Sequence, residues 1–402
     1  MIPTFIVVNA GSSSLKFQVF EQPDGAEARL VWKGLYEGLG GASHFLVRDP
    51  SGAKLDETTW SAEDGVGHEE ALMHLVSWLS QYREERKLIA IGHRVVHGGE
   101  TFSGPVLVDE TILQTLETLI PLAPLHQPHN LEPIKIVRRR LPGMPQVACF
   151  DTGFHQDQSS LVTMFALPRE MRERGVRRYG FHGLSYDYIA SVLKDYDHGL
   201  AEGRVIAAHL GNGASLCALK GGVSVATTMG FSALDGLPMG TRCGALDAGV
   251  VFYMLREMKL SLENAERLLY TKSGLLGVSG LSNDMRTLRA NAAANADARN
   301  AIDLFVYRIT REIGSLVAAL GGIDGLVFTA GIGENDAATR AEVIAALGWA
   351  GLALDEAANA SGGPRISSGS GPTAWVIPTN EELVIARQTW SVLGAAQDKL
   401  AS

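Results

Sequence analysis

Residues 4–20 read TFIVVNAGSSSLKFQVF, and this stretch decides the fold. An apolar, β-branched run over residues 4–8 ends in the turn-forming cluster NAGSSS, and residues 15–20 then alternate as a second strand does. The chain is therefore predicted to open with a strand, a tight loop and an antiparallel strand. Small residues in such a loop allow backbone N–H groups to approach phosphate oxygens closely.

A similar pattern returns half a chain later, at residues 205–219, which read VIAAHLGNGASLCAL. Gly11 corresponds to Gly211, and Asn9 corresponds to His209. A repeated unit of this kind indicates a duplicated domain with ligand loops that face each other. A third loop, 330–335, follows the apolar run 326–329. The pattern alone leaves open whether the three loops bind phosphate or are plain turns.

Helices are predicted from apolar residues spaced three and four apart. The predicted helices cover 69–82, 130–140, 302–320 and a segment from Asp336 onward, and residues 289–301 are expected to form a helical connection. The last helix is expected after a capping box at residues 379–382. Its predicted apolar face consists of Leu383, Ala386, Trp390 and Leu393.

Composition restricts the class of protein. The length of 402 residues allows two large domains or three small ones, and 46% apolar and 20% charged residues are typical of a soluble globular chain. The net charge of −9 argues against nucleic acid or an anionic membrane as a partner, and no apolar run is long enough to span a bilayer. Cys149, Cys217 and Cys243 have no disulfide or zinc spacing, and we expect buried free thiols in a cytoplasmic protein.

The common nucleotide motifs are missing. The chain has no G-x-x-x-x-G-K-[ST] segment, and Gly331-x-Gly333 lacks the third glycine of a dinucleotide fingerprint. His93, His97, His126 and His129 follow no specific zinc spacing. If the chain binds a nucleotide, it does so with loops of another kind.

Nine ordered motifs resemble those of the acetokinase family. They are VNAGSSSLK at 8–16, GHRVVHGG at 92–99, FDTGFH at 150–155, YGFHG at 179–183, HLGNG at 209–213, MGTRCG at 239–244, GLSND at 280–284, TAGIGEN at 329–335 and PTNEE at 378–382. The resemblance runs from residue 7 to residue 388. It implies an α/β fold of two duplicated actin-like (ribonuclease H-like) domains with a nucleotide cleft between them. We expect a first domain of residues 1–150 plus the C-terminal helix 383–402, and a nucleotide-binding domain of residues 151–382.

The resemblance also implies the reaction. An acetate kinase transfers the ATP γ-phosphoryl group reversibly and directly to acetate, which gives acetyl phosphate and ADP. Mg²⁺ is the expected ion, with Mn²⁺ as an alternative, and the expected partners are ATP, a short carboxylic acid and a second copy of the chain. A carboxylate with a pKa near 4 is already ionised at neutral pH, so this nucleophile needs no general base.

Four residues are predicted from these motifs to be catalytic. Arg94 and Arg242 would hold the acid and the transferring phosphoryl group, because a guanidinium binds such anions through two parallel hydrogen bonds. His182 would donate a hydrogen bond to the phosphoryl group. Asp151 could orient Arg94, hold the water shell of magnesium or, as a third alternative, form a phosphoenzyme.

The remaining site residues follow from motif position. Asn9 and Glu381 are the predicted magnesium ligands, although a charge at Glu381 also suits the first turn of a helix. Val96, Leu125, Phe181 and Ala233 would line the pocket for the alkyl group, and Ala233 stands where the family usually has proline. The predicted ATP-binding residues are Lys16, His209, Leu210, Gly211, Asn212, Gly213, Asp284, Met285, Arg286, Gly331, Ile332, Gly333, Glu334 and Asn335.

Three alternative functions remain at this level. A propionate or butyrate kinase would share the chemistry and differ in pocket size. A non-catalytic nucleotide-binding switch would share the fold but would not need Arg94, Asp151, His182 and Arg242 together. A nicotinamide oxidoreductase is disfavoured by the missing third glycine.

Overall fold

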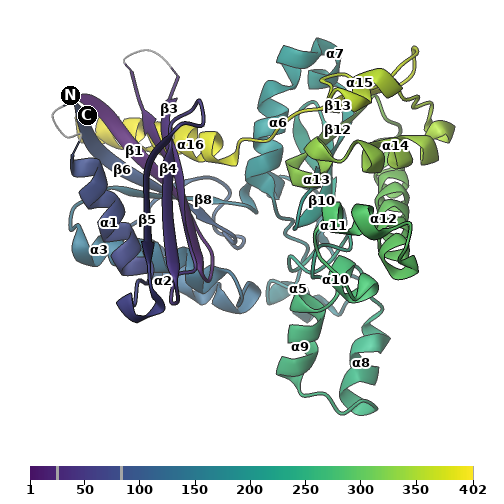
Figure 1. Cartoon of the computed structure of the whole chain (residues 1–402), viewed down its shortest axis with the longest axis horizontal. Coiled ribbons are helices and arrows are strands. Elements are labelled where there is room, and N and C mark those ends of the chain that lie inside the picture. Colours follow the sequence, from purple (N-terminus) through teal and green to yellow (C-terminus); the bar gives the residue numbers. More distant parts are fainter. Residues whose placement is uncertain (24–26, 82–84, 402) are drawn as a thin grey trace. The chain divides into compact units, whose positions relative to one another are not determined.

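A computed structural model describes residues 1–23, 27–81 and 85–401, with side chains described as far as residue 395. The chain forms two compact units (Figure 1). The first consists of Met1–Phe154 together with Asn380–Ser402, and the second is His155–Thr379.

The first unit contains an eight-stranded mixed sheet in the order β5-β4-β3-β2-β1-β6-β8-β7. β1 pairs antiparallel with β2 and parallel with β6, which in turn pairs parallel with β8. The strands are β1 (Ile2–Ala10), β2 (Ser14–Glu21), β3 (Arg29–Glu37), β4 (Ser43–Arg48), β5 (Lys54–Trp60), β6 (Arg86–Val95), β7 (Val106–Leu107) and β8 (Gln146–Phe150).

Helices cover both faces of this sheet. One face carries α1 (His68–Ser80), α2 (Glu110–Thr118) and α3 (Gln127–Arg140), and its core includes Ile6, Leu72 and Ile136. The other face carries α16 (Glu381–Ala401), which packs on β1, β6 and β8. A Cβ atom at Gly92 of β6 would lie 2.4 Å from Thr389 Oγ1, so glycine at this position allows α16 to approach the sheet closely.

The second unit repeats the central strand order. Its five strands run β11-β10-β9-β12-β13, and the first sheet contains the matching order β3-β2-β1-β6-β8 with the same parallel and antiparallel pairings. The strands are β9 (Arg204–Leu210), β10 (Ala214–Lys220), β11 (Val223–Thr227), β12 (Gly325–Thr329) and β13 (Thr373–Val376). The predicted duplicated α/β fold is thereby confirmed, and loops 11–13 and 211–213 occupy equivalent places.

In the second unit, α6 and α12 lie on opposite sides of the sheet (Figure 1). The helices are α4 (Ser160–Thr163), α5 (Arg169–Glu173), α6 (Gly183–Tyr196), α7 (His198–Glu202), α8 (Ala248–Arg256), α9 (Leu262–Thr271), α10 (Gly274–Ser279), α11 (Met285–Asn291), α12 (Ala296–Leu320), α13 (Ala330–Asn335), α14 (Ala337–Ala346) and α15 (Glu356–Ala360). The predicted stripe along α12 is buried from Ile302 to Leu320.

Several element predictions need correction. The third predicted loop, 330–335, is a short helix, α13, that follows β12 directly. In α16, the amide oxygen of Asn380 accepts from Leu383 N (3.1 Å), whereas the Thr379 hydroxyl contacts Ser185 instead of capping the helix. Trp390 is 40% exposed, because the helix turns Ile385 and Thr389 toward Gly92. Tyr82, at the end of the helix predicted over 69–82, lies outside the described residues.

The free thiols were expected to be buried, and this holds for two of the three. All three cysteines are free, with Cys149 and Cys217 buried and Cys243 half-buried. Burial raises the pKa of the Cys217 thiol to about 12. Within the described residues, no helix has the length and apolar character needed to cross a membrane.

Replacement of Gly92 by alanine tests the packing of α16. The new methyl group would meet Thr389 and Ile385, and overpacking of this kind costs about 1–3 kcal/mol, so the melting temperature should fall. Gly394→Ala on the same helix is the matched control, because its Cβ would meet nothing within 4 Å. That variant should hold or raise the melting temperature. Equal melting temperatures for Gly92→Ala and the unmodified protein in a calorimetric scan would contradict this packing.

Candidate functional site

The first unit contains a charged cluster at the carboxyl edge of its sheet. Arg94 lies near the end of β6, and Asp151 directly follows the parallel neighbour β8. Arg94 Nε and Nη2 donate to the Asp151 carboxylate at 3.0 and 2.8 Å, and Arg94 Nη1 lies 3.0 Å from Glu381 Oε2 at the start of α16. Parallel strands end at one edge of a sheet, which is why residues distant in sequence meet here.

The carboxylates keep this arginine charged. Burial acts to lower the pKa of Arg94, but Asp151 and then Glu381 outweigh it and raise the pKa above its ordinary value. Burial, followed by the charge of Glu381, raises the pKa of the neighbouring Glu382. The cluster is therefore a fixed cation held between two carboxylates, with a third acid beside it.

Asn9 and Lys16 lie opposite each other on β1 and β2. Lys16 lines a cavity of about 220 Å³ together with Lys33, Arg48 and Glu382. Lys16 belongs to the first unit, whereas the other predicted ATP-binding residues belong to the second.

Three side chains of the first unit bear on the expected Mg²⁺ site. Asn9, Asp151 and Glu381 offer oxygen atoms, which this ion prefers. Glu381 contacts Arg94 through Oε2, and the described residues contain no group of three or more His, Cys, Asp or Glu side chains placed to hold a metal ion. The residues fit an ion that takes few protein ligands and completes its shell with water and phosphate oxygens.

His182 is held in a strained position in the second unit. It precedes α6 with φ 58° and ψ 23°, a left-handed conformation that is uncommon outside glycine. Its Nδ1 lies 2.9 Å from Ser215 Oγ, and its ring stacks on His209 with 4.2 Å between ring centroids. His209 Nδ1 in turn lies 2.8 Å from Ser185 Oγ. The two imidazoles thus form one buried pair with a serine hydroxyl on each.

Two donors converge on loop 211–213. A Cβ atom at Gly213 would lie 3.1 Å from His182 Nε2 and 3.8 Å from Arg242 Nη2, so both side chains face this glycine. Arg242 Nη1 donates to the Ala233 carbonyl at 2.9 Å. The structure therefore brings His182, Arg242, Ala233 and the loop together, and glycine leaves room between the donors.

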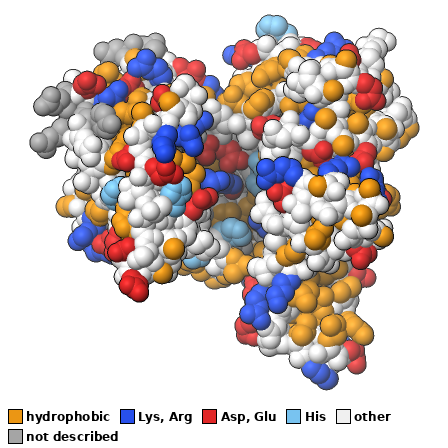
Figure 2. All heavy atoms as spheres, viewed as in Figure 1, with side chains coloured by type: hydrophobic (Ala, Val, Ile, Leu, Met, Phe, Trp, Pro, Cys, Tyr) orange, Lys and Arg blue, Asp and Glu red, His pale blue; other side chains and the backbone are white. Residues whose placement is uncertain are grey.

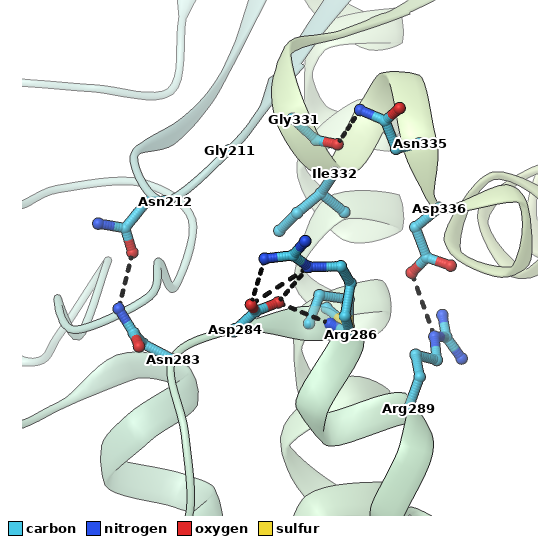
Figure 3. A pocket seen from close by; sticks show the side chains of 11 residues that line it. Gly211, Asn212, Asn283, Asp284, Arg286, Arg289, Gly331, Ile332, Asn335 and Asp336 are labelled. Atoms are coloured by element: carbon cyan, nitrogen blue, oxygen red, sulfur yellow. Dashed lines mark hydrogen bonds and ion pairs between the residues drawn. The ribbon is translucent and has the colours of Figure 1, made fainter. Parts of the chain in front are cut away.

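A cavity of about 790 Å³ opens beside the same loop (Figure 3). Asn212 Oδ1 accepts from Asn283 Nδ2 at 3.3 Å on one side, and Asn335 Nδ2 donates to the Gly331 carbonyl at 2.9 Å on the other. Asp284 pairs with Arg286 between them. The lining residues are Gly211, Asn212, Asn283, Asp284, Met285, Arg286, Arg289, Gly331, Ile332, Asn335 and Asp336.

Eight of these lining residues were predicted from motifs, and others of the predicted set lie elsewhere. Leu210 is fully buried in β9, and Gly333 is buried within α13. The Glu334 carboxylate accepts from Ala330 N and Thr379 N, at 2.8 and 3.2 Å. His209 and Gly213 belong to the histidine pair and its facing loop described above.

Asn283, Arg289 and Asp336 line the cavity but were not predicted. Asn283 lies inside the quoted motif 280–284, so its polar amide was an available signal. Arg289 and Asp336 pair with each other at 3.1 Å across 47 residues of sequence. Sequence spacing does not predict that two residues so far apart in the chain lie together.

The four residues predicted for the alkyl pocket divide between the units. Val96 and Leu125 belong to the first unit, and Phe181 and Ala233 belong to the second. Phe181 is 2% exposed and Leu125 is 43% exposed within the chain. The set stays a prediction.

Known proteins resemble the chain along nearly its whole length. The model of the "Acetokinase family" matches residues 4–387. An acetate kinase of Rhodopseudomonas palustris is 50% identical over 97% of this chain and 98% of its own, and one of Methylocella silvestris is 48% identical over 96% and 97%. A solved propionate kinase of Francisella tularensis superposes with a TM-score of 0.90 at 35% identity, and an acetate kinase of Porphyromonas gingivalis with 0.86 at 36%. Both superpositions cover 97% of this chain and 100% of the other.

Arg94→Ala should destabilise the protein. Removal of Arg94 leaves the Asp151 and Glu381 carboxylates, 3% and 13% exposed, without their shared cation, and a buried charge left without its partner costs about 3–5 kcal/mol. Thermal unfolding at pH 8 is the measurement.

Arg169→Ala is the control for this prediction. It removes an arginine from an exposed pair with Glu173, and exposed pairs contribute about 0–1 kcal/mol. An Arg94→Ala variant as stable at pH 8 as this control would show that the charged cluster does not stabilise the fold.

Proposed function

This chain belongs to the acetokinase family, and we propose that it transfers the γ-phosphoryl group of ATP reversibly to the carboxylate of acetate, giving acetyl phosphate and ADP. The observation that supports this most directly is the convergence of His182 and Arg242 on Gly213 beside a large cavity. Loop 211–213 lines that cavity with Gly211 and Asn212 and presents Gly213 to the two donors.

Catalysis would rest on positioning and charge stabilisation, as phosphoryl transfer generally does. The acid is already ionised and attacks the phosphorus in line, without a base. Arg242 and His182 Nε2 would stabilise the equatorial oxygens of the phosphoryl group. Arg94 would bind the carboxylate of the acid through its guanidinium fork.

Asp151 would orient Arg94. Its carboxylate already accepts hydrogen bonds from Nε and Nη2 of that guanidinium, which supports a positioning role over a phosphoenzyme. Direct transfer between the two substrates needs no carboxylate acceptor on the protein.

Magnesium would be bound from the first unit by Asn9 and Glu381, with Mn²⁺ as an alternative ion. When bound, the ion neutralises charge on the β- and γ-phosphates. The adenosine would lie in the cavity between Asp284, Arg286 and Ile332, and the phosphates would run toward loop 211–213.

Propionate is the second candidate acid. The solved propionate kinase of Francisella tularensis supports it, because it superposes on 97% of this chain with a TM-score of 0.90. Ala233 also has a smaller side chain than the proline usual at that place in the family. One extra methylene group in an apolar pocket changes the discrimination between two acids by roughly 10–200-fold. A looser pocket would discriminate less between acetate and propionate.

A homodimer in the cytoplasm completes the proposal. Apolar side chains are exposed along α8 and α9, where Figure 2 shows them gathered in one area. They are Val250, Phe252, Tyr253, Met258 and Leu262. An exposed apolar area of this kind is typical of an interaction surface.

The function is tested with a panel of acids. Purified protein, ATP and Mg²⁺ should convert acetate best, propionate second and butyrate poorly, with the acyl phosphate trapped by hydroxylamine. A chelator should stop the reaction, and acetyl phosphate with ADP should yield ATP. Nucleotide binding without product from any acid, in either direction, would favour the non-catalytic switch.

Arg242→Ala should lower kcat by roughly 10³-fold, as the loss of an arginine finger does. Arg242→Lys should recover little, since an ammonium cannot reproduce the guanidinium fork. Steady-state rates with acetate, compared with ATP binding by calorimetry, separate loss of catalysis from loss of fold. A kcat for Arg242→Ala within about threefold of the unmodified enzyme would remove Arg242 from the mechanism proposed by analogy with arginine fingers.

A further inference from the structure

Two buried hydroxyl groups form a chain that ends on His182. Tyr186 OH lies 2.5 Å from Ser215 Oγ, and Ser215 Oγ lies 2.9 Å from His182 Nδ1. Tyr186 is four residues after His182, one turn along α6, and Ser215 lies on β10. Tyr186 and Ser215 are both 0% exposed. None of the family motifs quoted above includes either residue.

The proton of Ser215 can serve only one of these two contacts. A serine hydroxyl has one hydrogen to donate and two lone pairs with which to accept. A phenol titrates near pH 10 in water, so Tyr186 is the better donor of the two hydroxyls. Tyr186 then donates to Ser215 Oγ, and Ser215 donates to His182 Nδ1. Because Nδ1 of a neutral imidazole accepts in this arrangement, the ring proton lies on Nε2.

This tautomer matters because of the place that Nε2 occupies. Nε2 faces Gly213, on the same loop that Arg242 approaches. An Nε2–H group can donate to an anionic oxygen placed there, whereas a bare Nε2 would present a lone pair to it. His209 is stacked on the ring, and a positive charge on both stacked imidazoles would be repulsive. The stacking therefore disfavours a positive charge on both rings at once, and in a neutral His182 the tautomer decides which ring nitrogen donates.

We propose that Tyr186 and Ser215 are positioning residues that hold His182 as the Nε2–H tautomer, so that it donates a hydrogen bond to the transferring phosphoryl group. This inference rests on the proposed function. It adds two residues to the site and gives a physical reason why Nε2 is the ring nitrogen that carries the donated proton.

The neighbouring histidine supplies a matched control. His209 Nδ1 lies 2.8 Å from Ser185 Oγ, and Ser185 is also 0% exposed. Ser185→Ala and Ser215→Ala therefore remove the same atom from equally buried serines, each beside an imidazole Nδ1. Only Ser215 contacts the imidazole whose Nε2 faces Gly213.

The first measurement is kinetic. Ser215→Ala should lower kcat by roughly 10- to 100-fold, less than the 10²–10³-fold typical of removing a stabilising donor itself. The KM values for ATP and acetate should stay within about threefold. The lost preference of His182 for the Nε2–H tautomer weakens a hydrogen bond made in the transition state and not the binding of either substrate. Ser185→Ala should keep kcat within about threefold, because Ser185 contacts the imidazole of His209 and not that of His182. Equal losses in the two serine variants would overturn the proposal.

The second measurement reads the tautomer itself, with ¹⁵N-histidine-labelled full-length protein and two-bond ¹H–¹⁵N spectra. The His182 signal is assigned by its absence in His182→Gln. We expect the Nε2–H pattern in the unmodified protein and an increased Nδ1–H population in Ser215→Ala. An Nδ1–H pattern in the unmodified protein, or an unchanged tautomer in an inactive Ser215→Ala variant, would refute it.

Tyr186→Phe tests the same chain if Ser215→Ala does not fold. It removes one oxygen and keeps the buried ring, so it should shift the tautomer in the same direction and lower kcat less than Ser215→Ala does. An unshifted tautomer in folded Tyr186→Phe would overturn the role of Tyr186.

The spectra need no substrate. An unmodified protein with the Nε2–H tautomer and no kinase activity would contradict the proposed function while leaving the hydrogen-bond direction intact.

Discussion

The parallel strand orders β1-β6-β8 and β9-β12-β13 are the constraint on which the rest of the structure depends. Parallel neighbours end at one edge of a sheet, so whatever follows them in sequence meets there. Arg94 and Asp151 meet in the first unit for this reason. In the second unit, loop 211–213 and helix α13 come together beside the large cavity in the same way.

The two units use this shared geometry for different chemistry. The first places a half-buried guanidinium between two carboxylates, and a buried charge is costly to leave without its partner. The second unit surrounds its stacked histidines with hydroxyl groups. In a buried site, neutral donors of fixed direction can stabilise a developing charge without a large desolvation cost. Arginine side chains supply positive charge in both units. In the second unit, the imidazole of His182 adds a hydrogen-bond donor of fixed direction.

Much of the framework was readable from the sequence. Apolar runs beside turn residues predicted both hairpins and the strand at 326–329. A three-to-four periodicity predicted the buried stripe of α12, because that period reflects which side of a helix is buried. Element ends were less accurate. Trp390 was assigned to a buried face that the close approach at Gly92 rotates toward Ile385 and Thr389. Residues 330–335 look like a loop by composition but continue β12 as a short helix.

The sequence by itself determined the duplicated hairpins, the family motifs and the kinds of donor available, since these depend on residue type and local order. Tertiary structure alone decided which donors meet. Arg289 pairs with Asp336, which is 47 residues away in sequence. His182, just before α6, contacts Ser215 on β10. The direction of the Tyr186–Ser215–His182 chain likewise depends on three buried side chains from two elements. Local sequence patterns encode the period of burial within one element, whereas hydrogen-bond partners are chosen by the packing of elements against each other.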